Sequence, residues 1–418
     1  MIRKVGRAIG ANYVNTFDPG EVTTVSAREE PGELPQADID RIWRSVIAYY
    51  KTGLHPAMAV CIRHRGKVII DRALGHVRGN CPGDGPEVPK EKATPDHLYS
   101  LFSASKAVTA MVIHLLDDEG LLHLDDAVEE YIPGFGQKGK GDVTIRHVLT
   151  HRAGIPAIPG DTVDLDLLTD NPEMIRLLCE AAPTSVAGRR LAYHAVTGGF
   201  VLGEIVRRVT GKDIRQVLQE KVCDPLGFKH FNYGVSEADL PLVAKEAFTG
   251  PPPRFPLTAL VNNALGVSLP EAVSISNDPR FLKAIVPAGN CIGTPNEVCK
   301  FFELLRLGGE LDGVRVFDHR TVRRATAEQS YLEVDTTLLL PLRYGMGFML
   351  GSEHLSFYGH RTPKAFGHIG FTSVVAWADP ERELSVALLN TGNPLVPIEI
   401  FRWFDVMWTI ARVCPRVR

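Results

Sequence analysis

The stretch "YSLFSASKAVTAMVIHLLDDEG" (residues 99–120) places a single cation inside an apolar run. Ser103 stands just before the run, and Lys106 is the only formally charged residue between Asp96 and Asp117. The pattern predicts a helix over 104–119 that is apolar on nearly every face, which is typical of a buried helix. A lysine is costly to bury, so its presence there calls for a specific reason.

Ser103 and Lys106 would touch on one face of a helix that begins at or just before Ser103. Burial disfavours the ammonium form, so it lowers the pKa of a lysine and can make the amine a base near neutral pH. A base beside a hydroxyl is the minimum requirement for an activated serine nucleophile. The alternative is a serine that caps the helix and a lysine that snorkels to solvent. S-x-x-K is a short pattern, which favours this alternative, but it occurs only once in this chain, which favours the catalytic interpretation.

Enzymes with an S-x-x-K serine also use a K-T-G-like triplet on a strand. The literal K-T-G at residues 51–53 ends an amphipathic helix (38–53), where Lys and Gly are ordinary last-turn and capping residues, and we reject it. His368-Ile369-Gly370 leads directly into a predicted strand. Its glycine would let a substrate approach the strand, and its imidazole could donate to an ester or carboxylate oxygen. The alternative is a simple turn before a strand.

Tyr193 is the candidate for a third element, a Tyr or Ser on a loop of the helical part. It lies in "LAYHAVTGGFVLGEIVRRVTGK" (191–212), just before a helix that is predicted from about Val196. A tyrosine near the lysine amine could share its proton and relay it to a leaving group. The alternative is a half-buried aromatic side chain.

Composition places the 418-residue chain among ordinary soluble globular proteins, with 44% hydrophobic and 23% charged residues and a net charge of −3. No block of one charge sign suggests nucleic acid or a membrane surface as a partner. The N-terminus lacks the apolar run of about 7–15 residues that a secretory signal needs. Seven dispersed cysteines without C-x-x-C spacing suggest reduced thiols, so we expect a cytoplasmic protein.

The predicted strands gather at the two ends of the chain. A hairpin with a tight turn at His64–Gly66 is expected over 57–75, and two strands joined at Asp379–Glu383 are expected over 366–392. Residues 79–95 read as a loop, and a helix over 398–413 ends the chain. Helical patterns fill the middle at 104–119, 144–150, 172–182, 196–210, 213–223 and 295–307.

We therefore predict an α/β domain with a mostly antiparallel sheet, built from residues 1–95 and 311–418. A mainly helical domain is inserted at 96–310. Its long, proline-rich segment 246–290 is expected to shape the substrate pocket, because long irregular segments inside a domain are usually functional. A cleft between the two domains would be the default ligand site.

Several motifs in one order carry a resemblance to a known family. They are "PDHLYSLFSASKAVTA" (95–110), "VTIRHVLTHRAGIP" (143–156), the 191–212 stretch, "VPAGNCIGTPNEVCKFFELLRLGGELDG" (286–313), "RYGMGFMLG" (343–351) and "FGHIGFTSVVAWADPERELSVALLNTG" (366–392). Over most of 50–395 the chain resembles the serine β-lactamase-related superfamily, which includes class C β-lactamases, D-alanyl-D-alanine carboxypeptidases and D-aminopeptidases. It looks most like the family VIII carboxylesterases and the related lovastatin-type acyltransferases.

The resemblance implies a β-lactamase/transpeptidase-like fold and a role for each motif residue. Ser103 would be the acylated nucleophile, Lys106 its general base and Tyr193 the proton relay. His368 and Gly370 would stand where the family has Lys/His-x-Gly. The backbone N–H groups of Ser103 and Phe371 would form the oxyanion hole.

Two departures from the β-lactamase pattern favour neutral ester substrates. Ala195 replaces the Asn of Tyr-x-Asn, and His368 replaces the lysine that would anchor a β-lactam carboxylate. We therefore expect a cofactor-free carboxylesterase acting on short-chain esters as small-molecule partners, without nucleic acid or membrane. The alternatives are a β-lactamase, a D-amino-acid peptidase or an acyltransferase of the same superfamily, and a non-catalytic binding descendant.

Other candidate sites in the sequence are weaker. His147 and His151 have a spacing that could bind a metal, but no Glu follows His147 and no further ligand completes a set, so we predict none. The acidic pairs at 117–118 and 125–126 are better explained as solvated turns than as a glycosidase pair. No G-x-S-x-G is present, so an α/β-hydrolase elbow is not indicated. The sequence does not indicate an oligomeric state.

Overall fold

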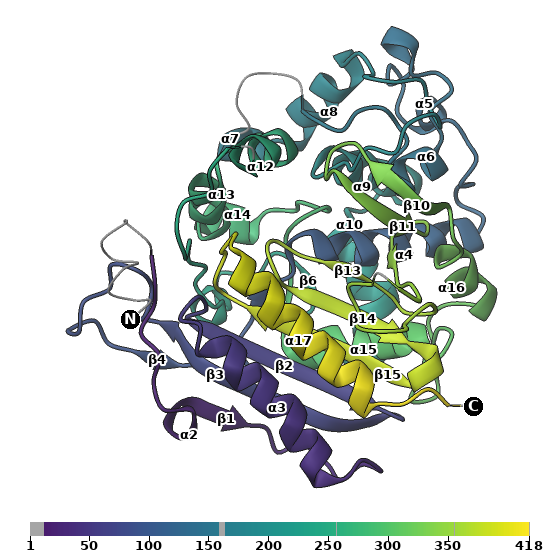
Figure 1. The fold of residues 1–418 in the computed structure, drawn as a ribbon. Helices are drawn as coiled ribbons and strands as arrows, with labels where there is room; N and C mark the ends of the chain where they lie inside the picture. The colour runs from purple at the N-terminus through teal and green to yellow at the C-terminus, as the bar shows by residue number, and fades with distance from the viewer. Residues whose placement is uncertain (1–11, 159–163, 256, 355, 418) are drawn as a thin grey trace.

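A computed structural model of the chain describes residues 12–158, 164–255, 257–354 and 356–417. Within these ranges the two ends of the chain build one ten-stranded antiparallel sheet (Figure 1). The strands follow the order β1 (Thr23–Val25), β3 (Lys67–Arg78), β2 (Ala57–His64), β15 (Leu384–Asn390), β14 (Val375–Asp379), β13 (Phe366–Ile369), β12 (Met349–Leu350), β11 (Leu340–Tyr344) and β10 (Ser330–Asp335), and β4 (Glu91–Lys92) pairs with β3. The antiparallel sheet predicted from both termini is confirmed.

The hairpin predicted around His64–Gly66 is confirmed. His64 pairs with Lys67 across the two-residue turn, in which Arg65 has φ 53° and Gly66 has φ 80°. Two positive φ angles define the mirror-image turn whose twist matches that of the flanking strands, and glycine adopts such angles without strain. This hairpin sets the register of β2, which pairs with β15 from the other end of the chain.

Residues 366–392 form three strands, so the prediction of two strands there is wrong. The turn at Asp379–Glu383 does join β14 to β15, but the preceding run breaks into β13 and β14. The Gly370 N–H donates to the Val374 carbonyl at 2.7 Å, so the chain reverses over these five residues. Gly370, Thr372 and Ser373 interrupt the apolar residues of this run, and all three lie in the reversal. As a result His368 lies within a strand of its own, next to the helical part.

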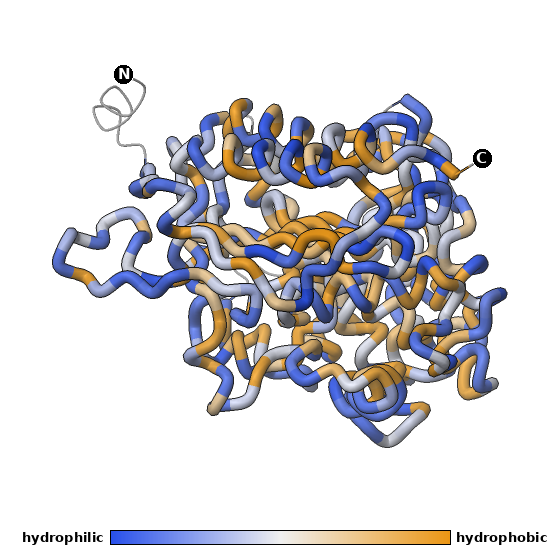
Figure 2. The backbone as a smooth tube through the Cα atoms, turned by 90° about the horizontal axis from the view of Figure 1, so that it is seen from below, coloured by the Kyte–Doolittle hydropathy of each residue, from blue (hydrophilic) through white to orange (hydrophobic). Residues whose placement is uncertain are grey.

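The central strands are buried on both faces, and their side chains alternate between two cores. Ala57, Ala59 and Cys61 of β2 face one core, whereas the alternating residues Met58, Val60 and Ile62 face the other. The second core is covered by α3 (Gln36–Tyr50) and α17 (Pro397–Val413), and α15 (Pro295–Arg306) packs against β14, β15 and β2. Figure 2 shows the hydrophobic strands between layers of helices.

The middle of the chain forms a mainly helical part around α4 (Ser105–Asp118), which packs against α9 (Thr197–Thr210) and α16 (His319–Ala325). The remaining helices there are α5 (Val128–Tyr131), α6 (Ile145–Leu149), α7 (Leu165–Thr169), α8 (Asn171–Glu180), α10 (Ile214–Leu218), α11 (Asp224–Leu226), α12 (Leu257–Leu265), α13 (Leu269–Ser276) and α14 (Pro279–Lys283). Short strands β5 (Tyr99–Ser100), β7 (Cys291–Gly293) and β6 (Asn232–Tyr233) form a small sheet, and β8 (Glu310–Leu311) pairs with β9 (Val314–Arg315). A short helix, α2 (Pro19–Val22), precedes β1.

Two expectations about the middle of the chain differ in detail from the structure. The segment 246–290 is not irregular throughout, because it contains α12, α13 and α14. α15, which the sequence placed in the helical domain, lies against the sheet, so its contacts favour the α/β part. The domain boundaries themselves stay a prediction. In the described part of the chain, no helix combines the length and the apolar character needed to cross a membrane.

Candidate active site

Ser103 lies at the start of the central helix, facing the sheet. It belongs to a 3₁₀ turn, η1 (Phe102–Ala104), that runs directly into α4. The Lys106 Nζ lies 3.2 Å from the Ser103 Oγ, so the two residues meet on one face of this helix start, at hydrogen-bond distance. η1 and α4 both contact β13, which brings the end of that strand to the serine.

Lys106 lies in a setting that favours its neutral amine. Its Nζ donates to the carbonyl oxygens of Ala195 (2.6 Å) and Ala288 (3.0 Å), and no acidic side chain among the described residues pairs with it. A neutral amine has two N–H bonds, enough for these two carbonyls, and one lone pair that can accept the Ser103 proton. Part of the residue's surface stays accessible, yet the protein around the amine desolvates it and lowers its pKa to about 7.

Tyr193 lies against the lysine, although 87 residues separate the two in the sequence. The Lys106 Nζ is 4.9 Å from the centre of the Tyr193 ring. Burial raises the pKa of the Tyr193 hydroxyl, and its interaction with the Ser103 side chain offsets part of that rise. The phenol therefore stays protonated at neutral pH, as a proton donor must.

Asp335 fixes the loop that carries Tyr193. Its Oδ1 accepts hydrogen bonds from the backbone N–H of Tyr193 (3.1 Å), Thr337 (2.8 Å) and Leu338 (2.9 Å), and the residue is fully buried at the end of β10. A strand of the sheet therefore positions a side chain of the helical part. Nothing in the local sequence around Asp335 indicated this long-range contact.

His368 lies behind Tyr193, and it is not among the residues that line the cavity beside Ser103. Its ring centre is 6.2 Å from that of Tyr193, and its Nδ1 lies 2.7 Å from the Ile369 carbonyl oxygen. Burial, together with the nearby charge of Lys106, lowers the pKa of His368 to about 3, so the ring is neutral at physiological pH. The contact expected between this imidazole and a substrate oxygen stays a prediction.

Gly370 lets β13 approach the serine turn. A Cβ added at Gly370 would lie 2.3 Å from the Leu101 carbonyl oxygen and 3.1 Å from the Val374 side chain. We expected this glycine to let a substrate approach the strand. In the structure, the atom nearest to such a Cβ is instead the carbonyl oxygen of Leu101, just before η1. The glycine is required for the packing that brings Phe371 and Ser103 to one cavity.

Two backbone N–H groups of this region are available to a developing oxyanion. Ser103 is the second residue of η1, and the first N–H groups of a helix have no acceptor within that helix. The Phe371 N–H donates no hydrogen bond to any described residue. Their use as an oxyanion hole stays a prediction. An oxyanion hole requires N–H groups that are not already engaged in hydrogen bonds, and these two meet that requirement.

A cavity of about 330 Å³ opens beside Ser103. Tyr193, Ala195 and Phe371 line it around the serine, Val261 and Leu265 of α12 form another wall, and leucines of the β10–β11 hairpin close it. No charged side chain is among the described residues that line it. Thr372, which the sequence did not single out, also lines the cavity, and its Oγ1 is buried without a hydrogen-bond partner among the described residues.

A smaller cavity of about 110 Å³ also opens beside the serine. It shares Ser103, Ala195, Leu265 and Phe371 with the first cavity. Further walls come from α13 and α14, including Ile275 and Phe281. The segment 246–290 therefore contributes walls to both cavities. Ser103 stands between a larger and a smaller apolar space.

The two histidines considered as metal ligands have other partners. Thr144 and His147 form a reciprocal capping box at the start of α6, in which the His147 Nδ1 accepts from the Thr144 N–H. His151 is buried against Tyr193, with ring centres 4.7 Å apart, and its Nδ1 accepts from the His194 N–H. Within the described ranges, no group of three or more His, Cys, Asp or Glu residues could hold a metal ion.

A serine beside a buried, unpaired lysine, set between an antiparallel sheet and a helical part, defines a serine hydrolase of the β-lactamase fold. The Beta-lactamase family model matches residues 44–405, and the chain belongs to this family. The predicted resemblance and the predicted fold class are thereby confirmed.

The relatives include proteins described as esterases. The chain is 32% identical over 316 residues to Esterase/beta-lactamase LipL of Mycobacterium tuberculosis (strain ATCC 25618 / H37Rv), a match that covers 72% of this chain and 71% of the relative. A penicillin-binding protein homolog from Caulobacter crescentus has a TM-score of 0.75 at 28% identity, with 92% of this chain and 99% of that chain covered. A family VIII carboxylesterase has a TM-score of 0.76 with the same coverage, and at 24% identity this likeness concerns the fold alone.

Proposed function

We propose that the protein hydrolyses carboxylic esters, short-chain esters among them, through an acyl-enzyme on Ser103. The observation that carries the proposal is the Lys106 amine, which lies 3.2 Å from the Ser103 Oγ without an acidic partner among the described residues. An amine in this setting is a base near pH 7, whereas a paired ammonium would not be.

The proposed reaction begins when Lys106 takes the hydroxyl proton as the Ser103 Oγ bonds to the ester carbonyl carbon. The carbonyl oxygen becomes an anion that accepts from the N–H groups of Ser103 and Phe371. The bond to the alcohol oxygen then breaks, and that oxygen takes the Tyr193 hydroxyl proton while Tyr193 regains one from Lys106. Water, deprotonated by the same lysine, attacks the acyl carbon. The bond from that carbon to the Ser103 Oγ then breaks, the Oγ takes the proton back from Lys106, and the acid is released.

The neutral lining of the site supports esters over penicillins. A β-lactam carboxylate would need a fixed positive charge, but the His368 ring is neutral and the cavity beside Ser103 has no charged lining residue among the described ones. Ala195 offers a methyl group where an asparagine would hold a substrate amide. The relative described as Esterase/beta-lactamase makes β-lactam hydrolysis the second candidate, and nitrocefin turnover as fast as ester turnover would favour it.

The test is the hydrolysis of p-nitrophenyl acetate and butyrate by the wild type, Ser103→Ala and Lys106→Met. We expect each variant to lose about 10³-fold or more in kcat/KM, because each removes a group that bonds to or deprotonates a reacting atom. Unchanged turnover in Ser103→Ala would overturn the assignment. A folded wild type that a fluorophosphonate probe does not label would favour a binding protein.

The chain offers a matched control for each variant. Ser105 lies two residues after the nucleophile, and its Oγ accepts only the Cys291 N–H at 2.9 Å, so Ser105→Ala should keep its activity. Lys140 is buried and donates to backbone carbonyls, including those of Gln137 and Cys179, both at 2.9 Å, and it lines neither cavity beside Ser103. Lys140→Met should therefore affect stability without abolishing turnover.

A further inference from the structure

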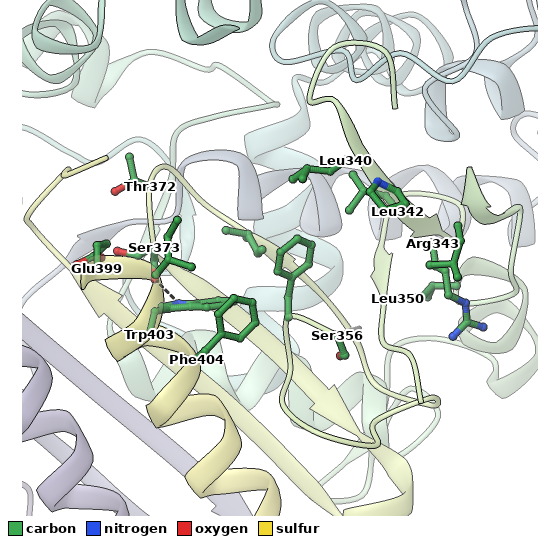
Figure 3. A pocket seen from close by; sticks show the side chains of 15 residues that line it. Leu340, Leu342, Arg343, Leu350, Ser356, Thr372, Ser373, Glu399, Trp403 and Phe404 are labelled. Carbon is green, nitrogen blue, oxygen red and sulfur yellow. Dashed lines mark hydrogen bonds between the residues drawn. The ribbon is translucent and has the colours of Figure 1, made fainter. Parts of the chain in front are cut away.

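A third cavity, of about 360 Å³, adjoins the cavity beside Ser103. It lies between the β10–β11 hairpin, which contributes Leu340 and Leu342, and α17, which contributes Trp403 and Phe404 (Figure 3). The two cavities share five residues, which are Leu340, Leu342, Phe357, Ile369 and Thr372. The two cavities are therefore neighbours, one beside Ser103 and the other at the first turns of α17.

The charged groups that line the third cavity are already engaged within the protein. The Glu399 carboxylate accepts from the Tyr49 hydroxyl and from the His55 Nε2. The Arg343 guanidinium donates to the Glu328 carboxylate and to the Gly351 carbonyl oxygen. A charged ligand would therefore find no free partner among these two groups.

The lining hydroxyls are engaged as well, with one exception. Ser356 bonds to Thr362 at 2.6 Å, and the Ser373 Oγ accepts from Asn390 at 3.1 Å. Of these hydroxyls, the Thr372 Oγ1 alone is buried without a partner among the described residues, and Thr372 lines both cavities. The rest of the surface that a ligand would meet is aliphatic or aromatic.

We infer that the site takes esters with one long aliphatic arm, which extends from Ser103 through the first cavity into the third, and one short group on the other side. This inference rests on the proposed esterase function and names its substrate class. The asymmetry follows from the volumes, since the path toward α17 joins cavities of about 330 and 360 Å³ whereas the pocket at α13 and α14 measures about 110 Å³. An alkyl arm suits the path because burying apolar surface is favourable and no polar group needs to be desolvated.

The expected signature is a kcat/KM that rises with chain length beyond butyrate. Each methylene buried in the transition state contributes up to about a fourfold gain. Two ester series distinguish which arm enters the path: p-nitrophenyl esters from acetate to dodecanoate lengthen the acyl group, and alkyl acetates of the same lengths extend the alcohol. All substrates are kept below their critical micelle concentrations, so that only monomers are presented.

Ile400→Glu tests the path itself. Ile400 lines the third cavity but not the cavity beside Ser103, and at 55% exposure it tolerates substitution without unfolding. A carboxylate there should lower kcat/KM for the C10 and C12 substrates of the longer-arm series by about tenfold or more relative to kcat/KM for the acetate. Ile398→Glu is the matched control, because Ile398 is 45% exposed on the same turn of α17 and lines neither cavity.

The outcomes separate this inference from the proposed function. Ser103-dependent turnover that peaks at acetate or butyrate in both series would overturn the long arm and leave the esterase standing. Equal effects of Ile398→Glu and Ile400→Glu on the C12 substrate would overturn the path as well. If no ester were turned over, the proposed function and this inference would both fall.

Discussion

Two lysines in this protein lie among backbone carbonyls, and the number of carbonyls separates their roles. The Lys140 Nζ donates to three of them, those of Gln137, Cys179 and Ala181, which matches the three N–H bonds of an ammonium group. The Lys106 Nζ donates to two, and its third neighbour is the Ser103 hydroxyl. The first arrangement satisfies a cation, and the second leaves room for a lone pair.

Esterase activity should therefore depend on pH through Lys106. Its pKa of about 7 means that the amine is half neutral at pH 7 and almost fully protonated at pH 5. Only the neutral amine can accept the serine proton, so kcat/KM for a neutral ester should rise with pH, about tenfold per unit below pH 6, and level off above pH 8. A profile measured from pH 5 to 9 with p-nitrophenyl butyrate, corrected for spontaneous hydrolysis, checks this.

The histidines near Lys106 should not produce an inflection near pH 7 in the profile of kcat/KM. Burial lowers the pKa of His194 to about 4 and that of His368 to about 3, and it lowers the pKa of His151 well below its usual range. These rings are neutral throughout the measured range. A profile that is flat from pH 6 to 8, or an inflection above pH 9, would contradict an unpaired lysine base.

At the scale of elements, the sequence predicted what local patterns determine. The helix expected over 104–119 is η1 followed by α4, and the hairpin at His64–Gly66 has the expected turn. The pairing of Ser103 with Lys106 also follows from helical spacing alone. The Asp335 contact to the Tyr193 N–H spans 142 residues, so no local pattern could reveal it. The reversal after His368 is local, and Gly370, Thr372 and Ser373 are the residue types that could have indicated it.

The junction between β13 and η1 gives a prediction at this scale. Gly370→Ala would place a methyl group 2.3 Å from the Leu101 carbonyl oxygen, so the end of β13 must move away from the serine turn. Phe371 would move with it, and displacements of about 1 Å at a reacting centre cost about 10²-fold. We expect kcat for p-nitrophenyl butyrate to fall by about that factor, while circular dichroism shows a folded protein.

Gly141→Ala is the control for that substitution. An added Cβ at Gly141 meets nothing closer than a Glu129 oxygen at 3.5 Å, and this glycine has no positive φ. It should leave kcat unchanged. If Gly370→Ala retained wild-type kcat, this would contradict the claim that close packing of β13 against η1 positions the active site.

The whole molecule depends on the two ends of the chain folding together. β2 near the N-terminus pairs with β15 near the C-terminus, and α3 packs against α17 over the same sheet. Figure 1 shows these early and late segments side by side. Both cavities on the path from Ser103 have walls from the late segments, whereas the serine itself comes from η1, just before α4, so the site exists only when the full sheet has formed.

Glu399 joins these two ends with a buried polar contact, and its removal should destabilise the molecule as a whole. The carboxylate on α17 accepts from Tyr49 of α3 and from His55 just before β2, and all three residues are buried. Glu399→Ala would remove the partner of the His55 Nε2 and the carboxylate that accepts from the Tyr49 hydroxyl, which costs about 2–4 kcal/mol of unfolding free energy. Urea unfolding followed by tryptophan fluorescence should show a lower midpoint than the wild type.

Asp405→Ala on the same helix is the control. Asp405 is half exposed, and its carboxylate lies 3.8 Å from the Arg402 guanidinium, a contact that contributes little to stability in water. Equal midpoints for the two variants would mean that the ends of the chain are held by their apolar cores alone.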